Sequence, residues 1–204
     1  MRTRVVQRAV MAAAALTASV IVVGCGPAPW TQEQPGASPS PAASVAPPVP
    51  NDLSSGSTER ELIAGAVTAQ VDYWSTLSMD RWTPDAVKPI SISLVTTVTP
   101  NDGQKVYLQK ATMIAIPANA DETFGPLDAQ IDASSVSPGY LVLSPYSYSQ
   151  TFNVGPVDAA ATHVTVQFTY DFLVQTKPDS SEYAKQTATD TLTVAIAQPE
   201  NKEE

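Results

Sequence analysis

Few residues in this 204-residue chain have side chains that enzymes use as nucleophiles or general bases. Cys25 is the only cysteine and His163 the only histidine. A catalytic thiol needs a base beside it, while a disulfide or a zinc site needs further cysteines or histidines. We therefore expect no disulfide, no bound metal or other cofactor and no catalytic residue, with His163 a single surface histidine at the start of a strand.

Known catalytic motifs do not occur either. The sequence has no G-x-S-x-G, H-E-x-x-H, Walker or G-x-G-x-x-G motif. Two acidic pairs, Asp121 with Glu122 and Asp128 with Asp132, are candidates for calcium, but neither has the spacing of an EF-hand loop. We expect these carboxylates to lie on a solvated surface.

The residues before Cys25 change from basic to apolar. Residues 1–8 carry three arginines and no acid, and residues 9–24 carry no charge. A basic region, a short apolar region and small residues are typical of a secretory signal peptide. The apolar run of about 16 residues is shorter than the roughly 20 that a membrane-spanning helix needs. An uncleaved membrane anchor is the alternative.

The last four residues of this region, Val22-Val23-Gly24-Cys25, resemble the lipobox of bacterial lipoproteins. The resemblance covers residues 1–25 only. It implies that the Cys25 thiol receives a diacylglyceryl group and that the chain is cut between Gly24 and Cys25. An acyl group such as palmitate on the new amine would add a further chain, and two or more chains anchor a protein stably. The resemblance places the protein on the outer face of the bacterial cytoplasmic membrane.

A segment poor in core residues follows. Eight of residues 26–57 are proline, and most of the others are Ala, Ser and Gly. Such a composition cannot bury enough apolar surface to offset its ordering entropy. We predict a cleaved signal peptide at 1–24, a lipidated and disordered tether at 25–57, one β-rich domain at 58–197 and a disordered acidic tail at 198–204.

The charge of the processed chain is strongly negative. Removing residues 1–24 takes three arginines from 11 basic residues and leaves 8 against 20 acidic ones, a net charge of −12. Such a surface disfavours nucleic acid and anionic headgroups as partners. The membrane contact is therefore predicted to be the lipid on Cys25.

Apolar and polar residues alternate over most of the domain, as in strands with one buried face. The clearest strands are predicted at 90–99, 105–116, 146–154, 164–174 and 187–197, and weaker ones at 127–133 and 140–144. The sequence Pro100-Asn101-Asp102-Gly103 predicts a hairpin turn between the first two. Antiparallel strands of this number resemble an immunoglobulin-like β-sandwich, although the cysteine pair of that family is absent.

The first part of the domain allows two interpretations. Thr58 and Glu61 have capping-box spacing, and apolar residues over 58–77 approximate one helical stripe. Residues 66–75 also alternate as a strand does. We favour an N-terminal helix, which makes a helix packed on a curved antiparallel sheet, as in nuclear-transport-factor-2-like domains, the alternative α+β fold.

Aromatic residues gather in residues 139–152. The alternation places Tyr146, Tyr148 and Phe152 on one face, expected to be core, whereas Tyr140 and the segment around Pro145 are better candidates for exposure. Because aromatic side chains dominate binding surfaces, Tyr140 and Tyr146 are the candidate partner contacts.

These features together predict a non-catalytic, lipid-anchored, extracytoplasmic protein. Its β-domain is expected to bind a protein or a cell-wall component. The alternative is an accessory subunit of an envelope secretion, conjugation or transport assembly. A hydrolase with an unrecognised site is a third and weaker interpretation.

Overall fold

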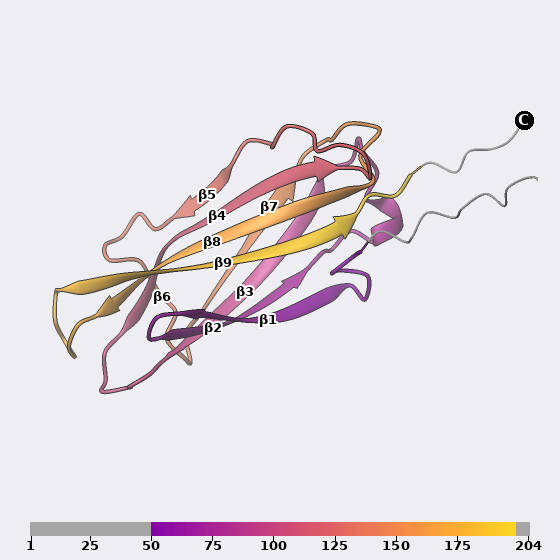
Figure 1. Cartoon of the computed structure of the whole chain (residues 1–204). Coiled ribbons are helices and arrows are strands. Elements are labelled where there is room, and N and C mark those ends of the chain that lie inside the picture. The colour runs from indigo at the N-terminus through magenta and orange to yellow at the C-terminus, as the bar shows by residue number, and fades with distance from the viewer. Residues whose placement is uncertain (1–49, 199–204) are drawn as a thin grey trace, which may run out of the picture. The chain divides into compact units, whose positions relative to one another are not determined.

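A computed structural model describes residues 50–198 of the chain (Figure 1). The predicted signal peptide, the lipidated Cys25 with its cleavage site after Gly24, most of the tether and the acidic tail lie outside the described residues. The described residues are those of the β-domain and the end of the segment that leads to it.

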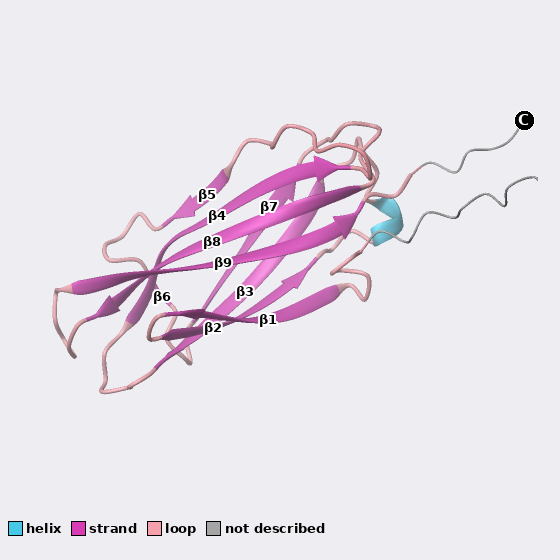
Figure 2. Cartoon of the chain, viewed as in Figure 1, coloured by secondary structure: helices cyan, strands magenta, loops and turns pink. Residues whose placement is uncertain are grey.

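The described residues form strands, turns and one short 3-10 helix (Figure 2). The expectation of a mostly antiparallel β fold is confirmed. No helix in residues 50–198 is long and apolar enough to cross a membrane. The elements are β1 Ser57–Ala64, β2 Val67–Trp74, the 3-10 helix Met79–Arg81, β3 Lys88–Val98, β4 Val106–Ala118, β5 Gln130–Ala133, β6 Tyr140–Leu141, β7 Ser147–Val154, β8 His163–Gln175 and β9 Tyr183–Ala195.

The strands form two sheets that face each other across one core. One sheet has the order β1-β2-β3-β7, and the other has the order β5-β4-β8-β9, with β6 also pairing with β4. Aromatic rings from the two sheets meet between them. The ring centroid of Phe168 on β8 lies 5.2 Å from that of Tyr73 on β2 and 5.8 Å from that of Phe152 on β7.

The predicted N-terminal helix is absent. Residues 58–77 instead form most of the β1–β2 hairpin, in which Ala64 pairs with Val67 and leaves Gly65 and Ala66 as a two-residue turn. Gly65 has a φ of 60°, which glycine adopts without strain and which such hairpin turns require. The structure therefore gives no helix here to support the α+β alternative.

The predicted hairpin between β3 and β4 is also wrong, because these strands belong to different sheets. Residues 140–144 lie between them. The Thr96 amide of β3 donates to the carbonyl of Val142 (2.8 Å), and the Val142 amide donates to the carbonyl of Val106 on β4 (3.0 Å). The chain bends within residues 99–103, but residues 140–144 take the hydrogen bonds that a hairpin would have made. The weak strands predicted at 127–133 and 140–144 are the shorter β5 and β6.

Residues 51–56, assigned to the tether by their sequence, pack on the domain. Leu53 is fully buried, and the Asp52 amide donates to the carbonyl of Thr193 on β9 (2.8 Å). The described chain also ends here, since the Gln198 side chain donates to the carbonyl of Ala161 (2.6 Å). We call this the terminal end of the domain. The opposite, distal end carries the β3–β4 connection, residues 99–105, and the β8–β9 loop, residues 176–182 (Figure 1).

Candidate functional site

Exposed apolar side chains concentrate in the segment that passes from one sheet to the other. We call residues 130–147 the crossover segment, because it begins in β5 of one sheet and ends at the first residue of β7 in the other. Four of the six large exposed hydrophobic side chains of the described residues belong to it, namely Ile131, Val136, Tyr140 and Tyr146. Single apolar residues are ordinary on a surface, so their concentration in one segment makes that segment a candidate contact surface.

A close backbone approach holds the middle of this segment against β4. A side-chain carbon on Gly139 would overlap the carbonyl group of Leu108, so only glycine fits there. The register of β4 shifts between Leu108 and Lys110, which leaves Gln109 as an extra residue. Its carbonyl accepts a hydrogen bond from the amide of Ser134 (3.1 Å). The irregularity in β4 thus fixes the loop before Tyr140.

Tyr140 lies over a buried tyrosine. Its ring centroid is 5.3 Å from that of Tyr148, and 37% of its surface is exposed. The Tyr148 hydroxyl in turn donates to a carboxylate oxygen of Asp132 on β5 (2.6 Å). Burial, followed by this hydrogen bond, raises the pKa of Tyr148. Tyr140 is therefore a partly exposed ring on a rigid support.

Tyr146 is more exposed than the alternation predicted. Tyr146 lies one residue before β7, so the alternation of inward and outward side chains that buries Tyr148 and Phe152 does not extend to it. As a result, 58% of its surface is exposed. Its amide donates to the carbonyl of Leu143 in a tight turn (3.0 Å). Beside it is a distal hollow of about 360 Å³, lined by Gly103, Lys105, Leu141, Leu143, Ser144 and Tyr146.

Positive charge also gathers toward the distal end. Of the seven Lys and Arg residues among 50–198, four lie there, namely Lys105, Lys110, Lys177 and Lys185. Lys110 and Lys185 both contact the carboxylate of Asp171, at 3.2 and 3.1 Å. Burial opposes ionisation of Asp171, but hydrogen bonds from Thr187 and both lysines outweigh it and lower its pKa. This end is thus less acidic than the rest of the domain.

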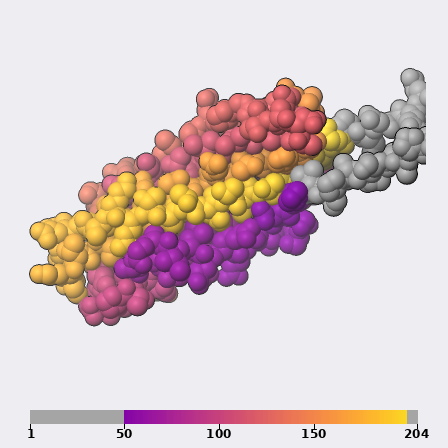
Figure 3. Space-filling model, viewed as in Figure 1, coloured from indigo at the N-terminus to yellow at the C-terminus, as the bar shows by residue number. Residues whose placement is uncertain are grey.

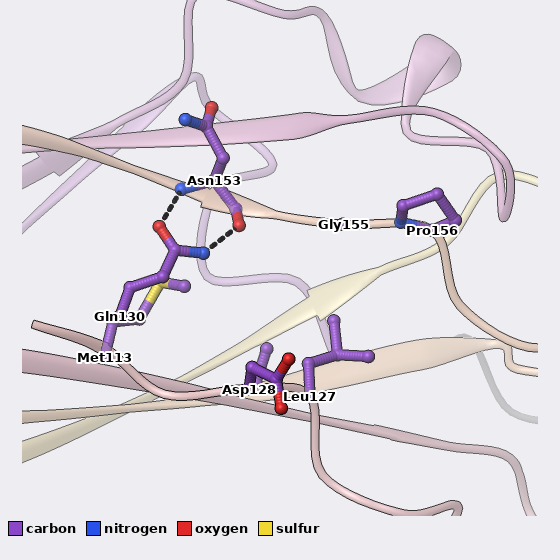
Figure 4. Close-up of a pocket in the computed structure, with 8 residues that line it drawn as sticks. Met113, Leu127, Asp128, Gln130, Asn153, Gly155 and Pro156 are labelled. Atoms are coloured by element: carbon purple, nitrogen blue, oxygen red, sulfur yellow. Dashed lines mark hydrogen bonds between the residues drawn. The ribbon is translucent and has the colours of Figure 1, made fainter.

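A second concave site opens where β5 and β7 form the adjacent edges of the two sheets. The seam crevice has a volume of about 270 Å³ and is lined by Met113, Ala115, Leu127, Asp128, Gln130, Asn153, Gly155 and Pro156 (Figure 4). The Gln130 side chain closes one end of it, accepting from the Asn153 amide (3.0 Å) and donating to the Asn153 carbonyl. No sequence motif marks this site, and it was not among the predicted ones.

Lys88 is the one fully buried cationic side chain among the described residues. Its ammonium donates to the carbonyls of Thr83, Pro84 and Ala86, at 3.1, 3.4 and 2.6 Å. Burial lowers the pKa of Lys88 to about 8. The ammonium is occupied by the loop before β3, so it is not available to a ligand in an adjacent hollow of about 330 Å³ lined by Thr83, Pro84, Asp85, Ala159 and Gln198.

His163 and the acidic residues that were candidates for catalysis or metal binding do not form a common site. His163 lies at the start of β8, where its ring nitrogen is 3.3 Å from the hydroxyl of Thr162. Within residues 50–198, no three His, Cys, Asp or Glu side chains are placed to hold a metal ion. Asp132 accepts its hydrogen bond from Tyr148 rather than sharing a site with Asp128.

Comparison with known proteins assigns no family. No family model and no curated protein matches the chain. A solved structure titled "X-ray structure of Northeast Structural Genomics Consortium target SoR45" aligns over 74% of this chain and 94% of its own, at 14% identity and a TM-score of 0.33. A similarity of that degree carries no argument about fold or function.

Proposed function

We propose that this chain is a non-catalytic, lipid-anchored protein on the outer face of the bacterial cytoplasmic membrane. Its β-domain, of the immunoglobulin-like sandwich type, binds a protein or cell-wall partner through the crossover segment. The lipobox-like residues ending at Cys25 support the anchor. The strand number, the alternation and the two facing sheets support the sandwich.

The observation that carries the binding proposal is the concentration of exposed apolar side chains in residues 131–146. Tyr140 and Tyr146 are the natural anchors, because tyrosine contributes strongly to interfaces and loses little side-chain entropy on binding. The distal hollow beside Tyr146 offers a place for a partner's side chain.

Photo-crosslinking in whole cells tests the binding surface. Benzoylphenylalanine replaces Tyr146 in one strain, Tyr140 in a second and the exposed Thr189 of β9 in a third. We expect the two tyrosine positions to give the same discrete adduct and Thr189 to give none. No adduct at either tyrosine, or an equal one at Thr189, would refute the proposed surface.

Metabolic labelling with fatty acid tests the anchor separately. We expect the wild-type protein to be labelled and membrane-bound, and a Cys25→Ala variant to be unlabelled. Equal labelling of the two proteins, or retention of the variant in the membrane at the precursor's mass, would contradict lipidation at Cys25.

A further inference from the structure

The seam crevice between β5 and β7 has the chemistry of a ligand site distinct from the crossover surface. Its floor is apolar, since it is formed by Met113, Ala115 and Leu127, and Met113 is almost fully buried. Its volume of about 270 Å³ is below the roughly 300 Å³ at which sites for drug-sized ligands begin. The crevice therefore suits a single side chain or a similarly small molecule.

Two polar groups at the crevice have different roles. The Gln130 amide is already engaged with the backbone of Asn153 on β7, so it shapes the site (Figure 4). Asp128 lines the crevice and is exposed, and no ion pair joins its carboxylate to a basic residue in the described part of the chain. Its charge is thus available to a ligand that enters.

The charge around the crevice favours a cation. Asp128 is the one charged residue among those that line it, and the four distal lysines lie elsewhere. A negative surface raises the local concentration of cations and disfavours anions. The apolar floor, in turn, favours a ligand whose positive group ends an apolar stem.

We propose that the seam crevice binds an alkylammonium or guanidinium group on an apolar stem, as a lysine or arginine side chain carries. The stem lies on Met113 and Leu127, and the cation pairs with the carboxylate of Asp128. This site is independent of the crossover surface, so either proposal can fail without the other.

The chain contains its own reporter for this test, since it has only four methionines, Met1, Met11, Met79 and Met113. Labelling the methionine methyl groups with carbon-13 in the full chain, held in nanodiscs, gives one signal in the crevice and one at Met79 as an internal control, and Met1 and Met11 add signals only where residues 1–24 are retained. The probes are butylammonium, the neutral butanol and the anionic butyrate. Capped lysine, with both backbone ends blocked, represents a partner's side chain.

We expect butylammonium to shift the Met113 signal in a saturable way in the millimolar range and to leave Met79 unchanged. Butanol should bind about two- to five-fold more weakly, as expected for loss of one exposed ion pair, and butyrate should not bind. Binding of capped lysine identifies a protein side chain as the source of the cation. Its failure, with butylammonium still bound, identifies a free amine, and either result upholds the site.

Two variants complete the test. Asp128→Asn should remove the difference between butylammonium and butanol, whereas Asp121→Asn, which changes another exposed acid, should not. Gly155→Leu should abolish the saturable shift, because Gly155 lines the crevice and the added Cβ meets no atom within 4 Å, so that the chain accepts a bulky group there without a clash. Equal affinity for all three probes, or a charge preference that survives Asp128→Asn, would overturn the proposal.

Discussion

The two long sides of the domain are closed in different ways. On one side β1 and β9 run next to each other, as the space-filling view shows (Figure 3). On the other side β5 is only four residues long, and side chains rather than a long strand span the gap to β7. The first seam brings two strands of eight and thirteen residues together, and the second leaves the crevice.

A single carboxylate organises the β1–β9 seam. Asp52 accepts from the Thr193 amide of β9 (2.7 Å) and pairs with Arg60 of β1 (2.7 Å). We call this the Asp52 bridge. At the other end of the seam, the Gln186 side chain of β9 accepts from the amide of Ala66 (3.1 Å). Both ends are thus tied through polar groups of β9.

The β5–β7 seam has two side-chain bridges of its own. Gln130 bonds to both backbone groups of Asn153, and Tyr148 bonds to Asp132. An amide side chain can replace a neighbouring strand at one position, but it cannot fill the space beside it. The crevice thus lies at the seam whose edge strand, β5, is only four residues long and leaves the rest of the gap to single side chains.

Breaking the Asp52 bridge should lower the stability of the domain more than the other changes below do. Asp52→Ala leaves the Thr193 amide and Arg60 without their partner, and we expect a loss of about 2 kcal/mol of unfolding free energy, since hydrogen bonds to charged groups contribute more than neutral ones. The partial exposure of both side chains keeps the loss below that of a fully buried pair. Urea unfolding followed by tryptophan fluorescence measures it. Asp80→Ala, an exposed acid at the terminal end, should change stability by less than about 0.5 kcal/mol.

Removing the Gln130 bridge should lower the free energy of unfolding by less than breaking the Asp52 bridge does. Gln130→Ala loses two hydrogen bonds at a partly exposed position, and we expect a loss of about 1 kcal/mol. Hydrogen exchange at the Asn153 amide should accelerate, because its acceptor is gone. Gln130→Glu keeps an acceptor for that amide and should protect it better than alanine does. Unchanged exchange at Asn153 in Gln130→Ala would contradict the bridge.

The Tyr148–Asp132 contact should make the stability of the domain depend on pH in alkaline solution. Burial raises the pKa of Tyr148 above its ordinary value of about 10, so the unfolded chain loses this proton first as the pH rises. Above about pH 10 the folded state then binds more protons than the unfolded state, and stability falls with pH. We expect Tyr148→Phe to lower the free energy of unfolding by about 1 kcal/mol at neutral pH. Above about pH 10 the stability of this variant should fall less steeply than that of the wild type. Parallel slopes for the two proteins in urea titrations at pH 8 to 11 would exclude this contribution.

Substitution of Asp128 should have the smallest effect on stability. Because it has no ion pair in the described part of the chain, Asp128→Asn should change the unfolding free energy by less than about 0.5 kcal/mol. Differential scanning fluorimetry with and without butylammonium measures whether Asp128 contributes to ligand binding. We expect wild type to gain thermal stability from the ligand and the variant to gain less.

The alternation of apolar residues predicted the long strands β3, β4, β8 and β9 because each has one face in the core. It failed at β1, which is an edge strand. In β1 the inward position of Arg60 holds a polar residue, whereas the outward Ile63 is apolar and 72% exposed. The apolar residues therefore do not alternate, and their spacing resembles that of one face of a helix. The turn at Gly65 was the signal that could have corrected the helix.

The candidate sites were harder to predict. The alternation of apolar residues predicted the burial of Tyr148 correctly and that of Tyr146 wrongly. The reason is that Tyr146 lies one residue before β7 begins, where side chains no longer alternate between the two faces of the sheet. The crevice depends on Gln130 reaching Asn153, 23 residues away, and the Asp52 bridge joins residues 141 apart. Contacts between such distant positions arise from the packing of the sheets and leave no local pattern.

The position of the Asp52 bridge also has a mechanical consequence. The described chain enters the domain at the terminal end, and β1 then runs toward the distal end. A force that pulls Pro50 away from a partner held at the distal end would act along the strands. It would load the eight residue pairs of the β1–β2 ladder in shear, together, rather than peel them apart one at a time. The same bridge that closes the seam would be the first contact to carry that load.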